Sequence, residues 1–219
     1  MKLINLNLCH VTWDGSFFQS PAIGRIMSRL SALWKDLKDE ILVNGTTVFD
    51  GDTELLECRD VRVTELNLDV EEDFFKKEYP EEYTWMHVNF TEKINVEKLG
   101  GARSYGWRLY DYDGLDQVRW VEKKLLANRS AKSATITTMW PKVDTSYIPC
   151  ISLLDFKIRS ESLIVSVFAR SIDVGKKFPF NVIEIMRVGE RVRKRLDCKY
   201  IILRMYIASA HVYLPGDKR

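Results

Sequence analysis

The sequence predicts an α+β fold in which a large mixed β-sheet packs against several helices. The 219 residues are 46% hydrophobic and 29% charged, which is typical of a globular domain with a sizeable core and excludes a disordered or fibrous chain. About seven segments show strand patterns, some of them joined as hairpins, and about three or four show helical spacing, a mixture that favours the α+β class. No repeat or Pro/Gly-rich linker interrupts the chain, so we expect one domain over residues 1–219.

The N-terminal half is expected to contain three strands and at least one helix. Alternating apolar and polar residues predict the first strand, and a Ser-Pro pair that matches an N-cap followed by a first-turn proline predicts the first helix. A hairpin is expected around Asp50-Gly51-Asp52, followed by an acidic segment. These elements are Lys2–Leu8 (strand), Ser20–Ile41 (helix), Leu42–Phe49 and Leu55–Leu68 (strands) and Glu71–Glu82 (solvated helix or loop).

The C-terminal half is expected to alternate between helices and strands. Leucine and valine at helical spacing predict an amphipathic helix, and a tight turn at Arg159-Ser160-Glu161 joins two of the strands that follow it. Pro179 opens a further helix with an apolar inward face. These elements are Leu115–Leu126 (helix), Ala134–Trp140, Cys150–Ile158 and Leu163–Phe168 (strands), Pro179–Leu196 (helix) and Tyr200–Ala208 (strand).

Charge, hydropathy and cysteine content argue against several classes of function. The 33 Lys and Arg residues nearly balance the 31 Asp and Glu residues, so we expect neither a nucleic-acid nor a membrane partner. The basic run from Arg187 to Arg195 is typical of a solvated helix face. No apolar stretch approaches the length of a membrane helix, and the polar start does not resemble a signal peptide, which predicts a cytoplasmic protein. The four cysteines stand apart, which predicts neither a metal site nor a disulfide framework.

Cys150 is the candidate nucleophile. It follows Pro149 at the mouth of a predicted strand, and the alternative interpretation is a buried structural cysteine. His211 and Tyr213 have i, i+2 spacing on the last strand, so both side chains project from the same face. Other polar groups are expected at the same sheet end, namely Arg170, Ser171, Asp173 and Asn181.

Six motifs resemble those of the thymidylate synthase superfamily; the last four match in order and closely in spacing, whereas the first has one residue fewer than the family's. They are Ser104-Tyr105-Gly106-Trp107-Arg108, Ile136 to Pro141, Pro149-Cys150, Arg170-Ser171-Ile172-Asp173, Pro179-Phe180-Asn181 and His211-Val212-Tyr213. The resemblance spans residues 105–213, and the earlier part looks more like the short archaeal and hydroxymethylase branches. It implies a thymidylate synthase-like fold and a homodimer packed through its sheets.

The resemblance also implies transfer of a one-carbon unit from 5,10-methylenetetrahydrofolate to C5 of a uracil nucleotide. Because C5 of a pyrimidine is a weak nucleophile, Cys150 would add to C6 and turn the ring into an enolate. Whether the product carries a methyl or a hydroxymethyl group stays open.

The roles that the family assigns fall on eight residues. Asn181 favours uracil, because an Asp commonly stands at that position in cytosine-specific relatives. The implied catalytic residues are Cys150, Tyr105, which helps to remove the C5 proton through water, and Asp173, which supports the ring and its water network. The implied substrate-binding residues are Arg170 and Ser171 for phosphate, Asn181 for the N3 and O4 edge of the base, and His211 and Tyr213 for the sugar hydroxyl.

Some positions depart from the family pattern. Ser133 and Ala134 stand where two arginines reach the phosphate bound by the partner subunit; Arg129 and Lys132 either substitute for them or are solvated. Lys177 replaces a glycine, and the chain ends shortly after Tyr213, before the segment that closes over the cofactor in folate-using bacterial enzymes.

These departures motivate an alternative function: a nucleotide or nucleoside tailoring enzyme, or a nucleotide-binding protein, without the standard folate chemistry. Two further alternatives stay open. Trp85 and Trp107 either line a pterin pocket or pack in the core, and Glu81 or Glu82 is a candidate for the family's proton-relay glutamate.

Overall fold

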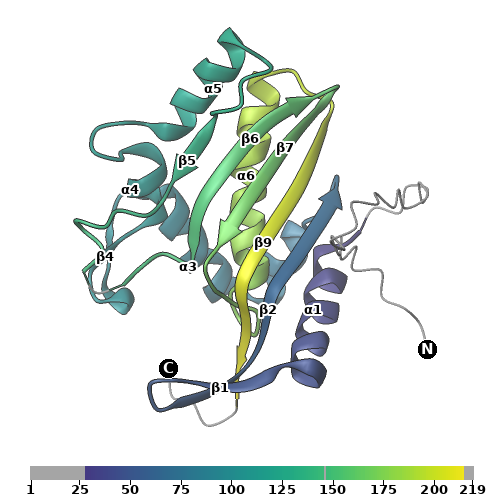
Figure 1. Cartoon of the computed structure of the whole chain (residues 1–219), viewed down its shortest axis with the longest axis vertical. Coiled ribbons are helices and arrows are strands. Elements are labelled where there is room, and N and C mark those ends of the chain that lie inside the picture. Colours follow the sequence, from purple (N-terminus) through teal and green to yellow (C-terminus); the bar gives the residue numbers. More distant parts are fainter. Residues whose placement is uncertain (1–27, 146, 215–219) are drawn as a thin grey trace, which may run out of the picture.

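The computed structural model describes residues 28–145 and 147–214 (Figure 1). The helices are α1 (Leu30–Asn44), α2 (Glu72–Glu78), α3 (Pro80–Thr91), the 3₁₀ turn η1 (Glu97–Leu99), α4 (Tyr105–Tyr110), α5 (Gln117–Ala127) and α6 (Phe178–Arg195). The strands are β1 (Thr46–Asp50), β2 (Thr53–Leu66), β3 (Asn95–Val96), β4 (Ala102–Arg103), β5 (Thr135–Thr137), β6 (Ile151–Arg159), β7 (Ser162–Ala169), β8 (Ile172–Asp173) and β9 (Tyr200–Tyr213).

One large mixed sheet organises the molecule. Its strands run in the order β1-β2-β9-β7-β6-β5, with β8 beside the far end of β9, and β3 and β4 form a separate small ribbon. Neighbouring strands are antiparallel except that β7 and β8 both run parallel to β9. Parallel neighbours require a crossover, and α6 supplies it between β7 and β9. The predicted α+β class with a large mixed sheet is therefore confirmed.

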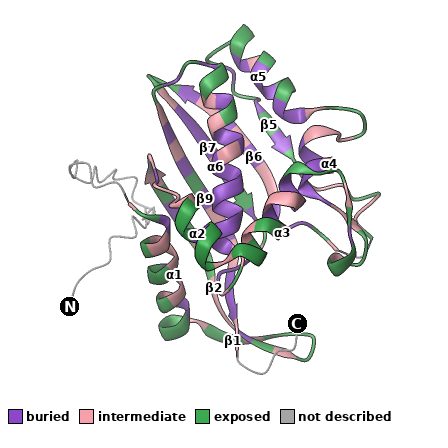
Figure 2. Ribbon diagram, turned by 180° about the vertical axis from the view of Figure 1, so that it is seen from behind, coloured by how far each residue is buried: buried purple, intermediate pink, exposed green. Residues whose placement is uncertain are grey.

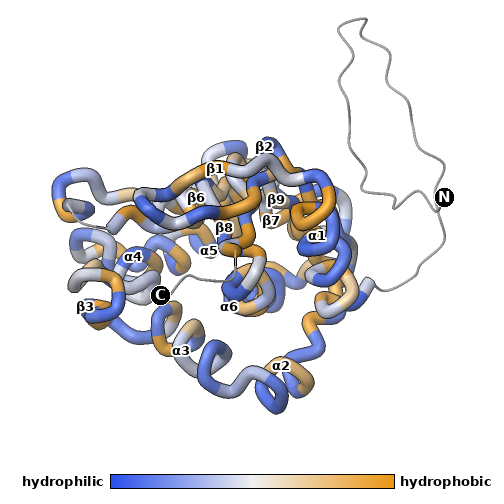
Figure 3. Tube along the Cα trace, turned by 90° about the horizontal axis from the view of Figure 1, so that it is seen from below, coloured by the Kyte–Doolittle hydropathy of each residue, from blue (hydrophilic) through white to orange (hydrophobic). Residues whose placement is uncertain are grey.

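Helix α6 packs closely on one face of this sheet. On β7, alternate residues Leu163 and Val165 are fully buried toward the helix. A Cβ added at Gly189 would lie 2.7 Å from Ile201 Cδ1 and 3.1 Å from Val165 Cγ2, so the glycine permits the close approach. Figure 3 shows the sheet on one side of α6 and helices α2 and α3 on its other side, and Figure 2 shows that most of α6 is buried. In the described ranges, no helix is long and apolar enough to span a bilayer.

The opposite face of the sheet has no helix over it in the described part of the chain (Figure 1). On this face Phe168 of β7 is 37% exposed and stacks on Tyr206 of β9, with the ring centroids 5.2 Å apart. Arg204 is exposed one pair further along β9. An aromatic pair at the centre of an uncovered sheet face is an unusual feature for a surface that meets only water.

Several predicted boundaries were wrong or fall outside the described residues. The strand expected at residues 2–8 and the helix start expected at Ser20 lie outside the described residues. Helix α1 begins only at Leu30, because Arg29 before it has extended backbone and forms a bridge with Asp69. The helix then continues to Asn44 into the segment predicted as a strand. Of the strand predicted from 134 to 140, only Thr135–Thr137 forms a strand (β5).

The acidic segment folds as two helices rather than one helix or a loop. Pro80 disfavours helical backbone at Tyr79, the residue before it, so α2 ends there and α3 begins with the proline in its first turn. Helix α4 was not predicted, since it has fewer than two turns. Ser104 caps it by accepting a hydrogen bond from the Trp107 N–H (3.3 Å).

Candidate active site

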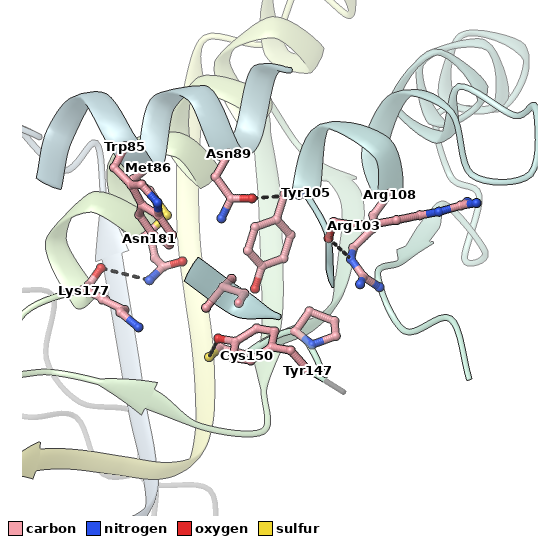
Figure 4. Close-up of a pocket in the computed structure, with 12 residues that line it drawn as sticks. Trp85, Met86, Asn89, Arg103, Tyr105, Arg108, Tyr147, Cys150, Lys177 and Asn181 are labelled. Carbon is pink, nitrogen blue, oxygen red and sulfur yellow. Dashed lines mark hydrogen bonds between the residues drawn. The ribbon is translucent and has the colours of Figure 1, made fainter. Parts of the chain in front are cut away.

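A cavity lies where α3, α4, the loop before β6 and the start of α6 meet (Figure 4). Cys150, Tyr105 and Asn181 line it together, so three residues that the sequence predicts for one site share one cavity. None of the twelve lining residues is an Asp, a Glu or a His. Its remaining polar walls are formed by Asn89, Arg103, Arg108, Tyr147, Lys177 and the indole of Trp85.

Cys150 stands directly before β6, and Arg170 fixes the segment that leads to it. The Arg170 N–H donates to the Cys150 carbonyl (2.9 Å), while its guanidinium donates to the carbonyls of Pro149 (3.1 Å) and Ile148 (2.6 Å). It also donates to the Ser171 hydroxyl (3.1 Å). Arg170 is exposed and does not line the cavity, and each terminal guanidinium nitrogen keeps a further N–H beyond these bonds.

Tyr105 is held rigidly behind the nucleophile. Its N–H donates to Asn89 Oδ1 (3.2 Å), its ring stacks on Phe90 with centroids 4.4 Å apart, and its hydroxyl accepts the Ile151 N–H (2.9 Å). A Cβ on the following Gly106 would collide with the Glu92 carbonyl, so the glycine lets α4 approach the end of α3. Burial, and secondly the nearby Cys150, raise the pKa of Tyr105, so its phenol stays neutral.

Tyr147 faces the sulfur from the other side. Its hydroxyl oxygen lies 3.3 Å from Cys150 Sγ, within hydrogen-bond distance for sulfur, and Figure 4 shows the ring beneath that of Tyr105 with its hydroxyl at the sulfur. Burial raises the pKa of Tyr147, and the adjacent Cys150 adds to this effect. Two neutral phenols therefore flank the nucleophile.

Asn181 projects from the first turn of α6 and is only 4% exposed. Its Nδ2 donates to the Lys177 carbonyl (2.9 Å), an assignment that turns Oδ1 toward the cavity as an acceptor (Figure 4). The Lys177 ammonium lies 6.0 Å from the centroid of the Trp85 ring, so this wall carries a cation over an aromatic face.

A buried ion pair anchors the loop between β5 and Cys150. Arg108 of α4 and Asp144 form two hydrogen bonds (2.6 and 3.1 Å), and their side chains are 1% and 3% exposed. Arg108 also donates to the carbonyls of Thr138 (2.6 Å) and Arg103 (3.0 Å), and Asp144 accepts the Trp140 N–H (2.7 Å). The charges are thus compensated in a dry environment, and α4 is tied to the loop that carries Tyr147.

Asp173, His211 and Tyr213 form a second group that does not line the cavity. Asp173 lies beside His211 in the parallel pair of β8 and β9, and its Oδ1 accepts the Lys176 N–H (3.1 Å), which shapes the turn before α6. The rings of His211 and Tyr213 meet edge to face at 5.1 Å, as their i, i+2 spacing predicts. Burial lowers the pKa of His211, which favours neutral imidazole.

The structure also places the residues whose interpretation stayed open. Trp85 lines the cavity, whereas Trp107 does not and instead has the Arg103 guanidinium 5.3 Å from its ring centroid. Glu81 and Glu82 are exposed on the first turn of α3, away from the cavity lining. Arg129 donates to the Leu196 carbonyl (2.8 Å), which holds one of its guanidinium nitrogens at the end of α6.

The basic run on α6 is paired with acidic side chains. Arg187 pairs with Glu72 and Glu184, and Arg191 pairs with Glu122. These partners come from α2, from α5 and from α6 itself. The run therefore ties neighbouring helices to α6 and leaves little uncompensated positive charge on the residues named here.

Sequence reasoning missed Tyr147, Asn89 and the pair formed by Arg108 and Asp144. Arg108 lay inside a recognised motif but carried no signal of a partner 36 residues away. Tyr147 stands three residues before Cys150, and a turn around Pro149 can bring such neighbours together, so this spacing was the one available hint.

Comparison with known proteins agrees with this geometry. The model of the thymidylate synthase family matches residues 34–216. A protein of Methanococcoides burtonii, described as "Putative thymidylate synthase", is 30% identical over 151 residues, which cover 65% of this chain and 69% of that protein. Proteins with the same description are 32% identical over 139 residues in Methanopyrus kandleri (62% and 66% coverage) and 28% identical over 200 residues in Methanothermobacter thermautotrophicus (82% and 88% coverage). With a cysteine, two tyrosines and an asparagine around one cavity and a family match over most of its length, the chain belongs to the thymidylate synthase family.

Proposed function

We propose that the protein transfers a one-carbon unit to C5 of a uracil nucleotide through a covalent adduct with Cys150. The observation that carries this proposal is the convergence of Cys150, Tyr105 and Asn181 on one cavity. A nucleophile, a phenol and an amide are the groups needed to add to C6 of the ring, to take part in a proton transfer and to form hydrogen bonds with the base.

The residues divide the chemistry among themselves. The Cys150 thiolate adds to C6, the C5–C6 π pair shifts to C4–C5 and the C4–O4 π pair moves onto O4, so that the resulting enolate makes C5 nucleophilic. Asn181 Oδ1 accepts the N3–H of uracil, and the remaining N–H of Nδ2 donates to O4, where negative charge develops. Tyr105 takes part in removal of the C5 proton through water. Cytosine lacks the N3–H, so this amide orientation favours uracil.

Side chains that line the cavity are of the kinds that would hold 5,10-methylenetetrahydrofolate, which would supply the one-carbon unit. Trp85 offers an aromatic face of the kind on which a pterin stacks, and the Arg103 and Lys177 cations suit the carboxylates of its glutamate. Arg170 with Ser171 would hold phosphate through the remaining guanidinium N–H groups, and His211 with Tyr213 would hold the sugar hydroxyl.

Exchange of the hydrogen at C5 tests the covalent step. The protein would be incubated with C5-tritiated dUMP, UMP, dCMP and CMP, each with and without methylenetetrahydrofolate, and release of tritium would be measured. We expect release from a uracil nucleotide that falls at least 1000-fold in Cys150→Ala, because the adduct cannot form. Mass analysis of the product would then distinguish a methyl from a hydroxymethyl group.

The matched control is Cys58→Ala. Cys58 is also a half-buried free thiol, but it lies on β2 and faces a different groove, beside α1. This variant should release tritium as the wild type does. Tritium release that is independent of Cys150, or no release from any nucleotide that the protein binds, would refute the transferase.

We further propose that the protein acts as a homodimer packed through the uncovered face of its sheet. Phe168 and Tyr206 form an aromatic pair at the centre of that face, where a second copy would remove both from water. Sedimentation should give a dimer for the wild type and a monomer for Phe168→Glu. A monomeric wild type at micromolar concentration would refute this arrangement.

One observation favours a second candidate function, a tailoring enzyme or nucleotide-binding protein on the same fold without folate. Ala134 is fully buried and has no side-chain donor, so this position cannot supply the phosphate contact that an arginine gives in the family, and Arg129 donates to the Leu196 carbonyl at the end of α6. In that case, release of tritium or binding should be strongest with a free nucleoside or another modified substrate, and methylenetetrahydrofolate should have no effect.

A further inference from the structure

We propose that Tyr147 is a catalytic residue whose hydroxyl donates a hydrogen bond to the Cys150 sulfur and stabilises its reactive thiolate form. This inference rests on the proposed function, in which that thiolate adds to the pyrimidine. It adds a residue to the reaction and assigns a second phenol a role separate from that of Tyr105.

The contact between Tyr147 and Cys150 is built into the fold. The two residues are separated by Ile148 and Pro149, and Arg170 binds the carbonyls of both intervening residues. Proline fixes its own φ angle, and a third hydrogen bond joins the Arg170 N–H to the Cys150 carbonyl (2.9 Å). The turn is therefore fixed from outside, and the 3.3 Å separation of hydroxyl and sulfur is a property of the turn.

The lining of the cavity limits which groups can assist the thiol. None of the twelve residues that line it can act as a carboxylate or imidazole base toward the thiol. The Tyr105 hydroxyl accepts the Ile151 N–H (2.9 Å), whereas the Tyr147 hydroxyl lies within hydrogen-bond distance of the sulfur. The charged and titratable groups that surround the sulfur are Tyr105 and Arg108 from α4, Arg103 from β4, Arg170 from the end of β7, Lys177 from the start of α6 and Tyr147 itself.

Tyr147 keeps a proton that it can donate to the sulfur. Burial raises the pKa of its phenol, so the O–H group is present at neutral pH. A thiol is a weak hydrogen-bond partner, whereas a thiolate accepts a charge-assisted hydrogen bond that is about twice as strong as a neutral one. The contact therefore stabilises the thiolate more than the thiol and lowers the free energy of forming the nucleophile.

The step balances without another reactant. The Cys150 proton leaves to solvent, and the thiolate accepts the Tyr147 O–H. The sulfur lone pair then forms the S–C6 bond as the C5–C6 π pair shifts to C4–C5 and the C4–O4 π pair moves onto O4. Sulfur loses its negative charge, so the hydrogen bond from Tyr147 weakens, and when the adduct later breaks, the same O–H stabilises the departing thiolate.

The test measures thiol reactivity apart from turnover. Wild type and Tyr147→Phe would be alkylated with iodoacetamide between pH 6 and 10, and the peptide that contains Cys150 would be quantified by mass spectrometry. We expect Tyr147→Phe to raise the apparent pKa of Cys150 and to slow its alkylation near pH 7 about tenfold, as loss of one charge-assisted hydrogen bond predicts. Release of C5 tritium should fall by a similar factor in kcat, with KM nearly unchanged.

Two further variants separate this role from a packing role. Tyr112→Phe removes a phenol hydroxyl that donates to the Met139 carbonyl (2.8 Å), and it should leave Cys150 alkylation unchanged. Tyr147→His keeps an N–H donor and should recover part of the lost reactivity. Circular dichroism would establish that each variant is folded.

An unchanged pH profile of alkylation in Tyr147→Phe would overturn the inference, as would Tyr147→His that is no more reactive than Tyr147→Phe. A different result would refute the proposed function, namely the absence of Cys150-dependent tritium release by the wild type. The two failures are therefore distinguishable.

Discussion

The cavity around Cys150 and the end of β9 that carries His211 hold their polar groups in different ways. In the cavity, the buried pair of Arg108 and Asp144 and the clamp of Arg170 on backbone carbonyls fix the positions. At the end of β9, hydrogen bonds between strands do so: Tyr213 donates to Asp50 of β1 (3.2 Å).

This difference indicates which region contributes most to the stability of the fold and which region makes that stability depend on pH. A compensated charge pair in a dry site is costly to break, so the geometry of the nucleophile is coupled to the stability of the whole fold. The strand end instead carries a buried imidazole, whose protonation changes with pH. Three predictions test this contrast, beginning with the largest expected effect.

Asp144→Asn should have the largest effect. The amide nearly preserves the shape but leaves the buried Arg108 guanidinium without its counter-charge, which costs about 3–5 kcal/mol of the free energy of unfolding. Urea unfolding followed by circular dichroism would measure the loss. The loop that carries Tyr147 should loosen at the same time, so Cys150-dependent tritium release should fall even where the variant is folded.

The control for this prediction is Asp111→Asn. It breaks an ion pair with Lys93 (2.9 Å) whose side chains are 30% and 46% exposed, and its unfolding midpoint in urea should stay close to that of the wild type. If both variants unfold at the same urea concentration, the cavity does not depend on its buried charges as we describe.

Asn181→Asp should have an intermediate effect, confined to substrate choice. A carboxylate cannot donate to O4 of uracil but accepts a hydrogen bond from the 4-amino group of cytosine. We expect kcat/KM for the uracil nucleotide to fall about 10- to 100-fold and the cytosine nucleotide to gain relative to it. Asn89→Asp places a carboxylate elsewhere on the same wall and should leave the preference for uracil intact. A preference that shifts equally in both variants would show that charge alone, and not base recognition by residue 181, is responsible.

Local sequence patterns predicted the frame of the fold well, for a physical reason. Strands β6, β7 and β9 and helix α6 follow regular apolar spacing, because one face of each is buried by the same sheet and helix contact. Boundaries failed where distant parts of the chain decide them. Arg29 is extended because it pairs with Asp69, forty residues away, and no local spacing records that contact.

The predicted and the missed residues of the candidate site differ for the same reason. Cys150, Tyr105 and Asn181 were predicted because they sit in motifs, and motifs preserve the residue types that the chemistry needs. Asp144 was not predicted, since a lone Asp in a loop usually faces water, and only the folded position of Arg108 gives it a buried role. Tyr147 was missed because its function arises from the turn at Pro149, whose geometry depends on Arg170 from another strand.

The smallest expected effect concerns His211 and the dependence of stability on pH. Burial is the largest cause that lowers its pKa, while Asp173 opposes it, so the folded protein keeps the imidazole neutral at pH values where the unfolded chain, with an ordinary pKa near 6.5, is already protonated. The unfolded state therefore binds more protons in this window, and the free energy of unfolding must fall as pH drops below about 6.5.

In His211→Asn this contribution disappears, so unfolding free energies measured between pH 7 and 5 should decline less steeply than in the wild type. Tyr213→Phe, which keeps the imidazole but removes the neighbouring hydroxyl, should retain the wild-type slope. If the free energy of unfolding changes equally with pH in all three proteins, His211 does not cause the pH dependence of stability. The contrast with the Cys150 cavity would then rest on stability alone.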